Sequence, residues 1–145
     1  MSIVDVKLKK LVDNVEIPFY ASEGAACADV IAVSERFDKD GFVEYGLGFS
    51  LEIPTGYKVD IRPRSSISSK TDLVLINSPG TIDSDYRGEI KVRFKPVKPV
   101  GAKRYKVGDK IAQIMISPVL QMKFEEVNEL SDTDRGEGGF GSTGS

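Results

Sequence analysis

Residues 47–61 read LGFSLEIPTGYKVDI and decide the fold. Apolar residues occupy every second position from Leu47 to Ile53 and again from Tyr57 to Ile61. The tripeptide between the two runs, Pro54-Thr55-Gly56, is typical of a turn. Because successive side chains of a strand point to opposite faces, the pattern predicts two half-buried strands joined by a short turn.

The same alternation recurs at residues 4–8, 90–94 and 120–124, and each run predicts a further strand. Turn-forming residues stand between such runs, as at Gly108-Asp109. No window of a dozen residues has helical periodicity, and only residues 65–70 predict one short helical turn. The sequence therefore predicts an all-β fold, a distorted jelly roll or β-barrel of short strands with at most one short helix.

The composition limits the chemistry that the chain can perform. The 145 residues suit one domain, and 20 basic against 22 acidic residues give a net charge of −2. This balance gives no general attraction to nucleic acid or to an anionic membrane, so neither is expected as a partner. The chain has no histidine and one cysteine, Cys27, which excludes imidazole catalysis, imidazole metal sites and an internal disulfide. Acid–base groups must then be carboxylates, lysines or tyrosines, and metal ligands must be oxygens.

The amino terminus lacks the apolar run of a signal peptide, and no apolar stretch reaches the length of a membrane span. We therefore expect a cytoplasmic protein, or a viral protein that works in the host cytoplasm.

The last fifteen residues, 131–145, differ from the rest of the chain. They contain five glycines and no aliphatic side chain, so they cannot form a core of their own. We therefore divide the chain into a β domain of residues 1–130 and a flexible glycine-rich tail of residues 131–145. The GEGGFG stretch at 136–141 matches a dinucleotide-binding fingerprint, but it follows no βαβ strand and opens no helix.

The tail could nevertheless bind a nucleotide. Its glycine amides, the guanidinium of Arg135 and the hydroxyls of Ser142 and Thr143 suit an anion. Phe140 offers a flat face on which a base could stack. The alternative is a solvated, disordered end, which the composition alone favours.

Internal segments also combine polar groups. Residues 77–88 carry two carboxylates beside a tyrosine, for which a polar hairpin is the alternative. Residues 62–70 gather three cations and four hydroxyls, which suits an anion site or a serine-rich loop. Gln113 and Asp29 interrupt apolar strands, and each taken alone is explained by a surface or turn position.

Taken in chain order, these segments resemble the homotrimeric, all-β dUTPase family. The resemblance runs from about Ala25 to the carboxyl end. The stretches GTIDSDYRG at 80–88 and RGEGGFGSTG at 135–144 match family motifs almost letter for letter. Residues 63–65 precede the first stretch, and Ile-Ala-Gln at 111–113 lies between the two, as the family requires.

The resemblance implies hydrolysis of dUTP to dUMP and pyrophosphate, which limits uracil incorporation into DNA and supplies dUMP for thymidylate synthesis. It implies that Asp83 activates the attacking water and that Tyr86 packs under the deoxyribose and excludes a 2′-hydroxyl. Asp29 would join the water network around a Mg²⁺ ion held by the three phosphates. The other implied substrate contacts are Asn77, Gly80, Thr81 and Ile82 around the uracil, Arg64, Ser65, Ser66 and Gln113 on the phosphates, and Arg135, Phe140, Gly141, Ser142 and Thr143 in the tail.

The resemblance also implies a homotrimer whose active sites are shared between subunits, with the tail closing a neighbour's site. The sequence departs from the family at Cys27 and Ser66, where a glycine is usual. Two alternatives remain at this point, a dCTP deaminase of the same fold and a regulatory binding protein built on the dUTPase fold.

Overall fold

The computed structural model describes residues 2–142 and 144, and within them the chain is almost entirely β-structure. The one described helix, α1, covers Ile67–Lys70, inside the segment for which a helical turn is predicted. It has four residues and is too short to cross a membrane. The strands are β1 Lys7–Lys10, β2 Ala28–Ile31, β3 Ser34–Phe37, β4 Val43–Gly46, β5 Phe49–Glu52, β6 Tyr57–Arg62, β7 Leu73–Val74, β8 Gly80–Ile82, β9 Lys91–Pro96 and β10 Lys110–Pro118.

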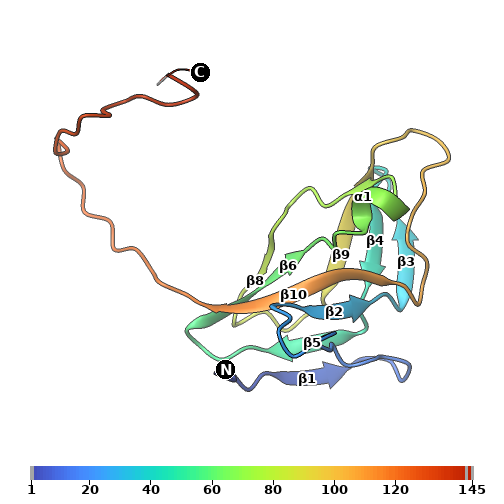
Figure 1. The fold of residues 1–145 in the computed structure, drawn as a ribbon. Helices are drawn as coiled ribbons and strands as arrows, with labels where there is room; N and C mark the ends of the chain where they lie inside the picture. Colours follow the sequence, from blue (N-terminus) through green and yellow to red (C-terminus); the bar gives the residue numbers. More distant parts are fainter. Residues whose placement is uncertain (1, 143, 145) are drawn as a thin grey trace.

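The strands form three antiparallel sheets (Figure 1). One four-stranded sheet has the order β2-β10-β6-β8, the other has the order β3-β4-β9-β7, and β1 pairs with β5 at one side. Neighbours in each sheet are mostly distant in sequence, as in β10 against β2 and β6. This arrangement confirms the predicted all-β, jelly-roll-like fold.

The core lies between the two larger sheets and is built from the alternating positions. Val59 and Ile61 of β6 face it from one sheet, and Tyr45 and Phe94 face it from the other. The rings of Tyr45 and Phe94 meet edge to face, with centroids 5.8 Å apart. The alternation read from residues 47–61 therefore predicts the core face correctly.

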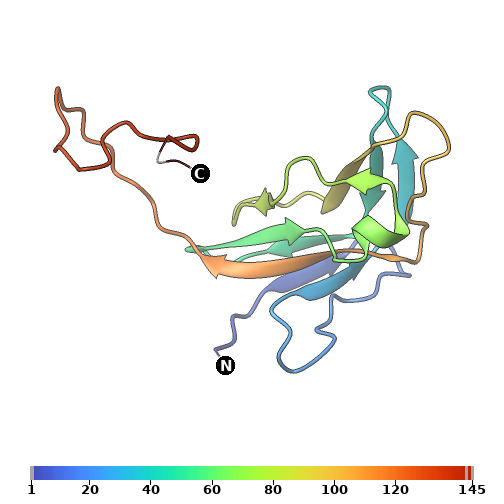
Figure 2. The ribbon, with the colours of Figure 1, turned by 45° about the horizontal axis from the view of Figure 1, so that its top comes forward.

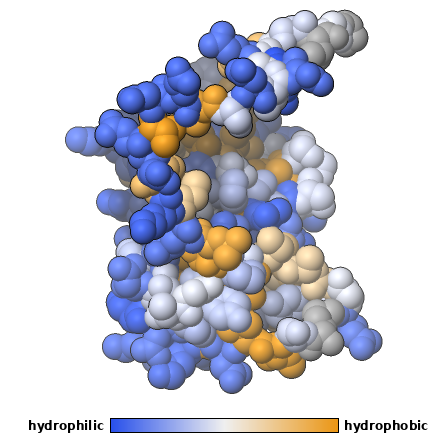
Figure 3. All heavy atoms as spheres, turned by 90° about the vertical axis from the view of Figure 1, so that its left-hand side faces the viewer, coloured by the Kyte–Doolittle hydropathy of each residue, from blue (hydrophilic) through white to orange (hydrophobic). Residues whose placement is uncertain are grey.

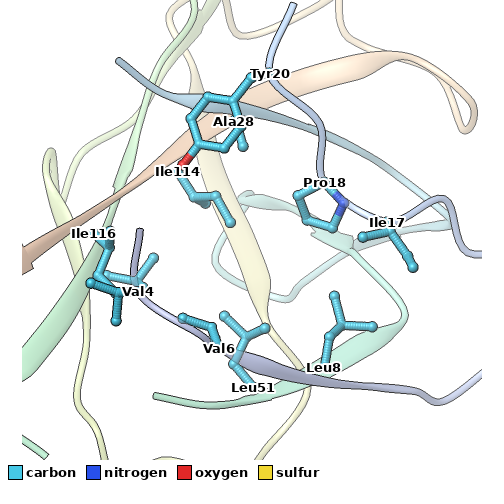
Figure 4. A pocket seen from close by; sticks show the side chains of 11 residues that line it. Val4, Val6, Leu8, Ile17, Pro18, Tyr20, Ala28, Leu51, Ile114 and Ile116 are labelled. Carbon is cyan, nitrogen blue, oxygen red and sulfur yellow. The ribbon is translucent and has the colours of Figure 1, made fainter. Parts of the chain in front are cut away.

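An open apolar groove lies where β1 and β5 meet the β2-β10-β6 sheet (Figure 4). Val6 and Leu8 line it near the amino terminus, and Ile114 and Ile116 of β10 line it from the sheet. Tyr20, also on its rim, is 57% exposed, so apolar surface stays open to solvent in the single chain.

The strand predicted at residues 120–124 is not formed, and that prediction is wrong for the single chain. Strand β10 ends at Pro118, and from there the chain runs away from the domain without secondary structure (Figures 1 and 2). Leu120, Met122 and Phe124 are 95%, 78% and 83% exposed. The alternation is present, but within this chain the segment has no neighbouring backbone with which to pair. Apolar patches among hydrophilic residues are visible on the side from which the segment leaves (Figure 3).

Candidate active site

The hairpin after β8 borders a small open cavity of about 230 Å³. Strand β8 pairs with β6, with Gly80 opposite Ile61, and this pairing fixes one wall. The chain then turns tightly, with the amide of Tyr86 donating to the carbonyl of Asp83 at 3.2 Å. Six residues singled out from the sequence line this one cavity: Asn77, Gly80, Thr81, Ile82, Asp83 and Tyr86.

The ring of Tyr86 is held in place by its own hairpin. Its hydroxyl donates to the carbonyl of Glu89 at 3.1 Å. A Cβ atom at Gly88 would lie only 2.4 Å from that hydroxyl oxygen, so the ring occupies space that only a glycine leaves free. Arg87 braces the turn by donating to the carbonyl of Ser84 at 2.7 Å. The cavity wall is therefore shaped before any ligand binds.

A second cluster forms where β2, β10 and the end of β6 meet. Gln113 of β10 lies opposite Asp29 of β2 and Arg62 of β6. Its side-chain amide donates to the carbonyl of Pro63 at 3.1 Å and so fixes the start of the loop that carries Arg64, Ser65 and Ser66. The sequence separations are large, and only the sheet brings these segments together.

Arg64 and Asp29 form an ion pair in this cluster. The Arg64 Nε donates to Asp29 Oδ1 at 3.1 Å, and the Lys110 Nζ lies 3.8 Å from Asp29 Oδ2. Asp29 is buried, and these two cations are its nearest charged partners. Arg64 also lies within 3.5 Å of the Ser66 hydroxyl and donates to the Lys110 carbonyl at 3.3 Å.

Side-chain oxygens that could bind a divalent cation are scarce in this cluster. Within residues 2–142 and 144, no group of three or more His, Cys, Asp or Glu side chains could hold a metal ion. Asp29 is the carboxylate nearest the phosphate-binding candidates, and Arg64 and Lys110 already engage it. A metal at this place would therefore take most of its ligands from phosphate oxygens and water, as Mg²⁺ does in many nucleotide sites.

Asp83 and Gln113 lie near opposite ends of β6. Ile82 pairs with Val59, so Asp83, the next residue, lies near Lys58, whereas Gln113 lies opposite Arg62. Lys58 and Arg62 are four residues apart, which is about 13 Å along the strand at ~3.3 Å per residue. The spacing between strands adds to this, so one chain does not bring Asp83 next to its own phosphate-binding candidates.

The tail lies apart from both clusters (Figures 1 and 2). Its local turns are ordered by hydrogen bonds, including Arg135 Nε to the Gly138 carbonyl at 2.8 Å. Phe140 is fully exposed and has a positive φ of 51°. Gly141 and Ser142 follow it, and Thr143 lies outside the described residues. The single chain therefore does not place any of these residues against a nucleotide site.

Sequence analysis missed several residues that line these clusters. Glu89, Ile90 and Lys91 contribute to the hairpin cavity, and Lys110 joins the Asp29 cluster. The residues after Gly88 read as an ordinary alternating strand, so nothing in the pattern marked them. The position of Lys110 just before the Ile-Ala-Gln stretch was the one available signal.

The fold is similar to that of one known class of protein. The chain superposes on the Staphylococcus bacteriophage 80alpha dUTPase, whose structure was solved with dUPNHPP, with a TM-score of 0.79. The match covers 97% of this chain and 99% of the phage chain, at 25% sequence identity. The architecture is thus that of the all-β phage dUTPases.

Comparison of the sequence with known proteins identifies the family. A family model described as dUTPase matches residues 13–144. The deoxyuridine 5′-triphosphate nucleotidohydrolase of Nautilia profundicola is 46% identical over 140 residues, covering 96% of this chain and 98% of the relative. That of Hydrogenobaculum sp. is 44% identical over 142 residues, covering 94% and 96%. The chain belongs to the dUTPase family.

Proposed function

We propose that the protein hydrolyses dUTP to dUMP and pyrophosphate. The observation that carries the proposal is the hairpin cavity, which gathers a carboxylate, an aromatic ring and polar backbone in about 230 Å³. The names of the 44–46% identical relatives support the same substrate. In the cell, this activity limits uracil incorporation into DNA and supplies dUMP for thymidylate synthesis.

The chemistry is assigned to Asp83. It lies on the exposed rim of the hairpin cavity, where its carboxylate can accept a proton from a water that attacks phosphorus. The face of Tyr86, fixed by the Glu89 carbonyl and by Gly88, packs under the deoxyribose and leaves no room for a 2′-hydroxyl. Asn77 and the backbone from Gly80 to Ile82 read the uracil edge.

The phosphates are assigned to the second cluster. Arg64, Ser65, Ser66 and Gln113 offer donors to their oxygens. These residues would leave room for a Mg²⁺ ion held mainly by phosphate oxygens and water, with Asp29 in its water network. Such an ion would supply positive charge to the phosphates.

We infer that one active site combines residues of several copies in a homotrimer. A general base must lie within ~2.6–3.2 Å of the water that it activates. The separation of Asp83 from Gln113 along β6 is several times larger, which supports pairing of Asp83 in one copy with the phosphate cluster of another. The apolar groove and the exposed side chains of residues 119–130 supply surface for such an assembly.

The tail, residues 131–145, is the third component. We assign Arg135 to the terminal phosphate, Phe140 to the face of the uracil, and Gly141, Ser142 and Thr143 to further phosphate contacts. Closure of this segment over the nucleotide would exclude water and complete the set of donors. Residues 1–130 would then form the folded domain.

The test is pyrophosphate release from dUTP, compared with dCTP, dTTP and UTP, each with Mg²⁺ and with excess chelator. We expect rapid release from dUTP alone and strong dependence on Mg²⁺. Ammonia release from dCTP would instead identify a deaminase of the same fold. Nucleotide binding without any turnover would leave only a regulatory role.

A further inference from the structure

A buried carboxylate that the proposed mechanism does not use lies next to the hairpin. Asp60, in the middle of β6, is only 3% exposed, although strand alternation places it on the face opposite the core residues Val59 and Ile61. It lies opposite Thr81 of β8 and accepts from the Thr81 hydroxyl at 3.3 Å. Because an unpaired buried charge is costly, this carboxylate needs a positive partner.

The positive partner of Asp60 is Lys58, two residues earlier on the same face of β6. The Lys58 Nζ donates to both carboxylate oxygens of Asp60, at 3.0 and 3.1 Å. The residues of β10 that lie opposite this pair, Met115 and Ser117, carry no charge. Among the described residues, Lys58 forms an ion pair with no other carboxylate. The position of its ammonium group is therefore set by Asp60.

Lys58 also lies near Asp83, to which we assign the reaction. Ile82 pairs with Val59, so the same register continued by one residue places Asp83 beside Lys58. Both residues line one open cavity of about 640 Å³. A lysine carries its charge on a flexible four-carbon chain, so the ammonium group has two carboxylates within its range. In this structure it binds Asp60 and not Asp83.

The other cations near the hairpin are also paired with carboxylates other than Asp83. Lys91 lines the hairpin cavity, and its Nζ lies 3.6 Å from an oxygen of Glu44. The guanidinium of Arg87, in the turn itself, lies 4.0 Å from Glu52. In the part of the chain that the structure describes, the Asp83 carboxylate forms no ion pair. The remaining titratable groups that line the two cavities beside it are Tyr57, Asp85, Tyr86 and Glu89.

We propose that Asp60 is a positioning residue for the reaction, which holds the Lys58 ammonium group away from Asp83 and so leaves the Asp83 carboxylate unpaired. The proposal rests on the assignment of Asp83 as the base in the proposed function. An ammonium group beside a carboxylate stabilises its charged form, so a carboxylate paired in this way accepts a proton less readily. A released Lys58 would therefore weaken the base, and Asp60 prevents its release.

The experiment is steady-state hydrolysis of dUTP by the full chain with Mg²⁺, with kcat and KM measured separately. Asp60→Asn keeps an acceptor for the Thr81 hydroxyl but releases Lys58. We expect kcat to fall about threefold to tenfold with little change in KM, because the base is weakened by about one pH unit. When Asp60→Asn is combined with Lys58→Gln, the released cation is removed as well, and kcat should return to within about twofold of wild type.

Asp72→Asn is the matched control. Asp72 also pairs with a lysine, Lys98 at 2.9 Å, but it lines neither cavity beside Asp83. Its kcat should stay within about twofold of wild type. Wild-type kcat in Asp60→Asn, or an equal loss in Asp72→Asn, would overturn the proposal. A loss that persists when Lys58→Gln is added would overturn it as well, because the ion pair would then serve only the fold.

A carboxyl-carbon NMR titration of the full chain without nucleotide is the second measurement, and it needs no turnover. The Asp83 signal is identified as the one that is missing in Asp83→Asn. In Asp60→Asn, we expect Asp83 to take up its proton at a pH about one unit below that of wild type, and near the wild-type pH once Lys58→Gln is added. An unchanged titration in Asp60→Asn, or one that Lys58→Gln does not restore, would overturn the proposal. The expected titrations in a protein that fails to hydrolyse dUTP would show that only the proposed function is wrong.

Discussion

The hairpin of residues 77–88 and the glycine-rich tail are both assigned to the same nucleotide, yet the fold treats them in opposite ways. Three residues of β8 pair with β6 at the start of the hairpin, and internal hydrogen bonds hold Tyr86 and Arg87. The tail has only local turns of its own and lies away from the domain. The hairpin has its shape before a ligand binds, whereas the tail would have to be ordered by binding.

The comparison separates the preorganised part of the proposed site from the part that binding must order. Asp83, to which we assign the reaction, follows directly after β8, so the sheet fixes the position of its backbone while its side chain stays exposed. Groups that only have to cover the ligand can lie on a segment that has no role in folding, provided that binding orders this segment. Substitutions that disturb the packing of the hairpin should therefore alter both structure and activity, and substitutions in the tail should alter activity alone.

The largest effect is expected from the hairpin carboxylate. Asp83→Asn keeps the shape of the side chain but removes the proton acceptor, so kcat should fall by ~10²–10⁴-fold. Melting temperature and the affinity for a non-hydrolysable dUTP analogue should stay close to wild type. Asp85→Asn is the matched control, since Asp85 is two residues away and does not line the hairpin cavity. A kcat within a few-fold of wild type would remove Asp83 from the role of base.

Removal of the tail is expected to have the next largest effect. A chain that ends at Leu130 should melt at the wild-type temperature, because residues 131–142 are almost entirely exposed. Its kcat/KM for dUTP should fall by about 10²-fold, a loss similar to that caused by removing one hydrogen-bond donor to developing charge. A lowered melting temperature would show that the tail also stabilises the domain.

Mixing the two inactive proteins tests whether the tail serves its own chain. Asp83→Asn with an intact tail and the Leu130 truncation with an intact Asp83 can be unfolded together and refolded, so that the proposed homotrimer would contain both kinds of chain. If hairpin and tail come from different copies, some mixed sites are complete and activity returns. Activity that stays at the level of the parents, with mixing verified by mass, would refute the shared site.

Sequence reasoning was most reliable where the information is local. The alternation of residues 47–61 predicts the core strands, and the family motif at 80–88 contains five residues that line the hairpin cavity. It failed at residues 120–124, because alternation reports an amphipathic segment and not whether a partner strand exists. The ion pair of Arg64 with Asp29 was also missed, since 35 residues separate the two and only the sheet register brings them to 3.1 Å.

A smaller effect is expected from a substitution that changes the shape of the hairpin and leaves its charge unchanged. In Gly88→Ala the new methyl group would lie 2.4 Å from the Tyr86 hydroxyl oxygen, so the half-exposed ring has to move. The preference for dUTP over UTP, measured as a ratio of kcat/KM values, should fall by roughly tenfold. Gly24→Ala serves as the control because its added Cβ meets nothing within 4 Å. An unchanged ratio in Gly88→Ala would mean that the position of the ring does not select the sugar.

The smallest effect is expected from Tyr86→Phe, which keeps the ring but removes the hydrogen bond that holds it. The substitution removes one hydrogen bond, from the hydroxyl to the Glu89 carbonyl at 3.1 Å, on a side chain that is 48% exposed. Such a bond contributes about 0.5–1.5 kcal/mol, and solvent competes for it at this exposure. The dUTP/UTP ratio should therefore change no more than a few-fold, whereas Tyr86→Ala, which removes the ring itself, should narrow it much further. If Tyr86→Phe proves as damaging as Tyr86→Ala, the hydroxyl and not the ring face rejects ribose. The hairpin would then act through a polar contact that forms only when the nucleotide binds, and its advantage over the tail in preorganisation would disappear for this residue.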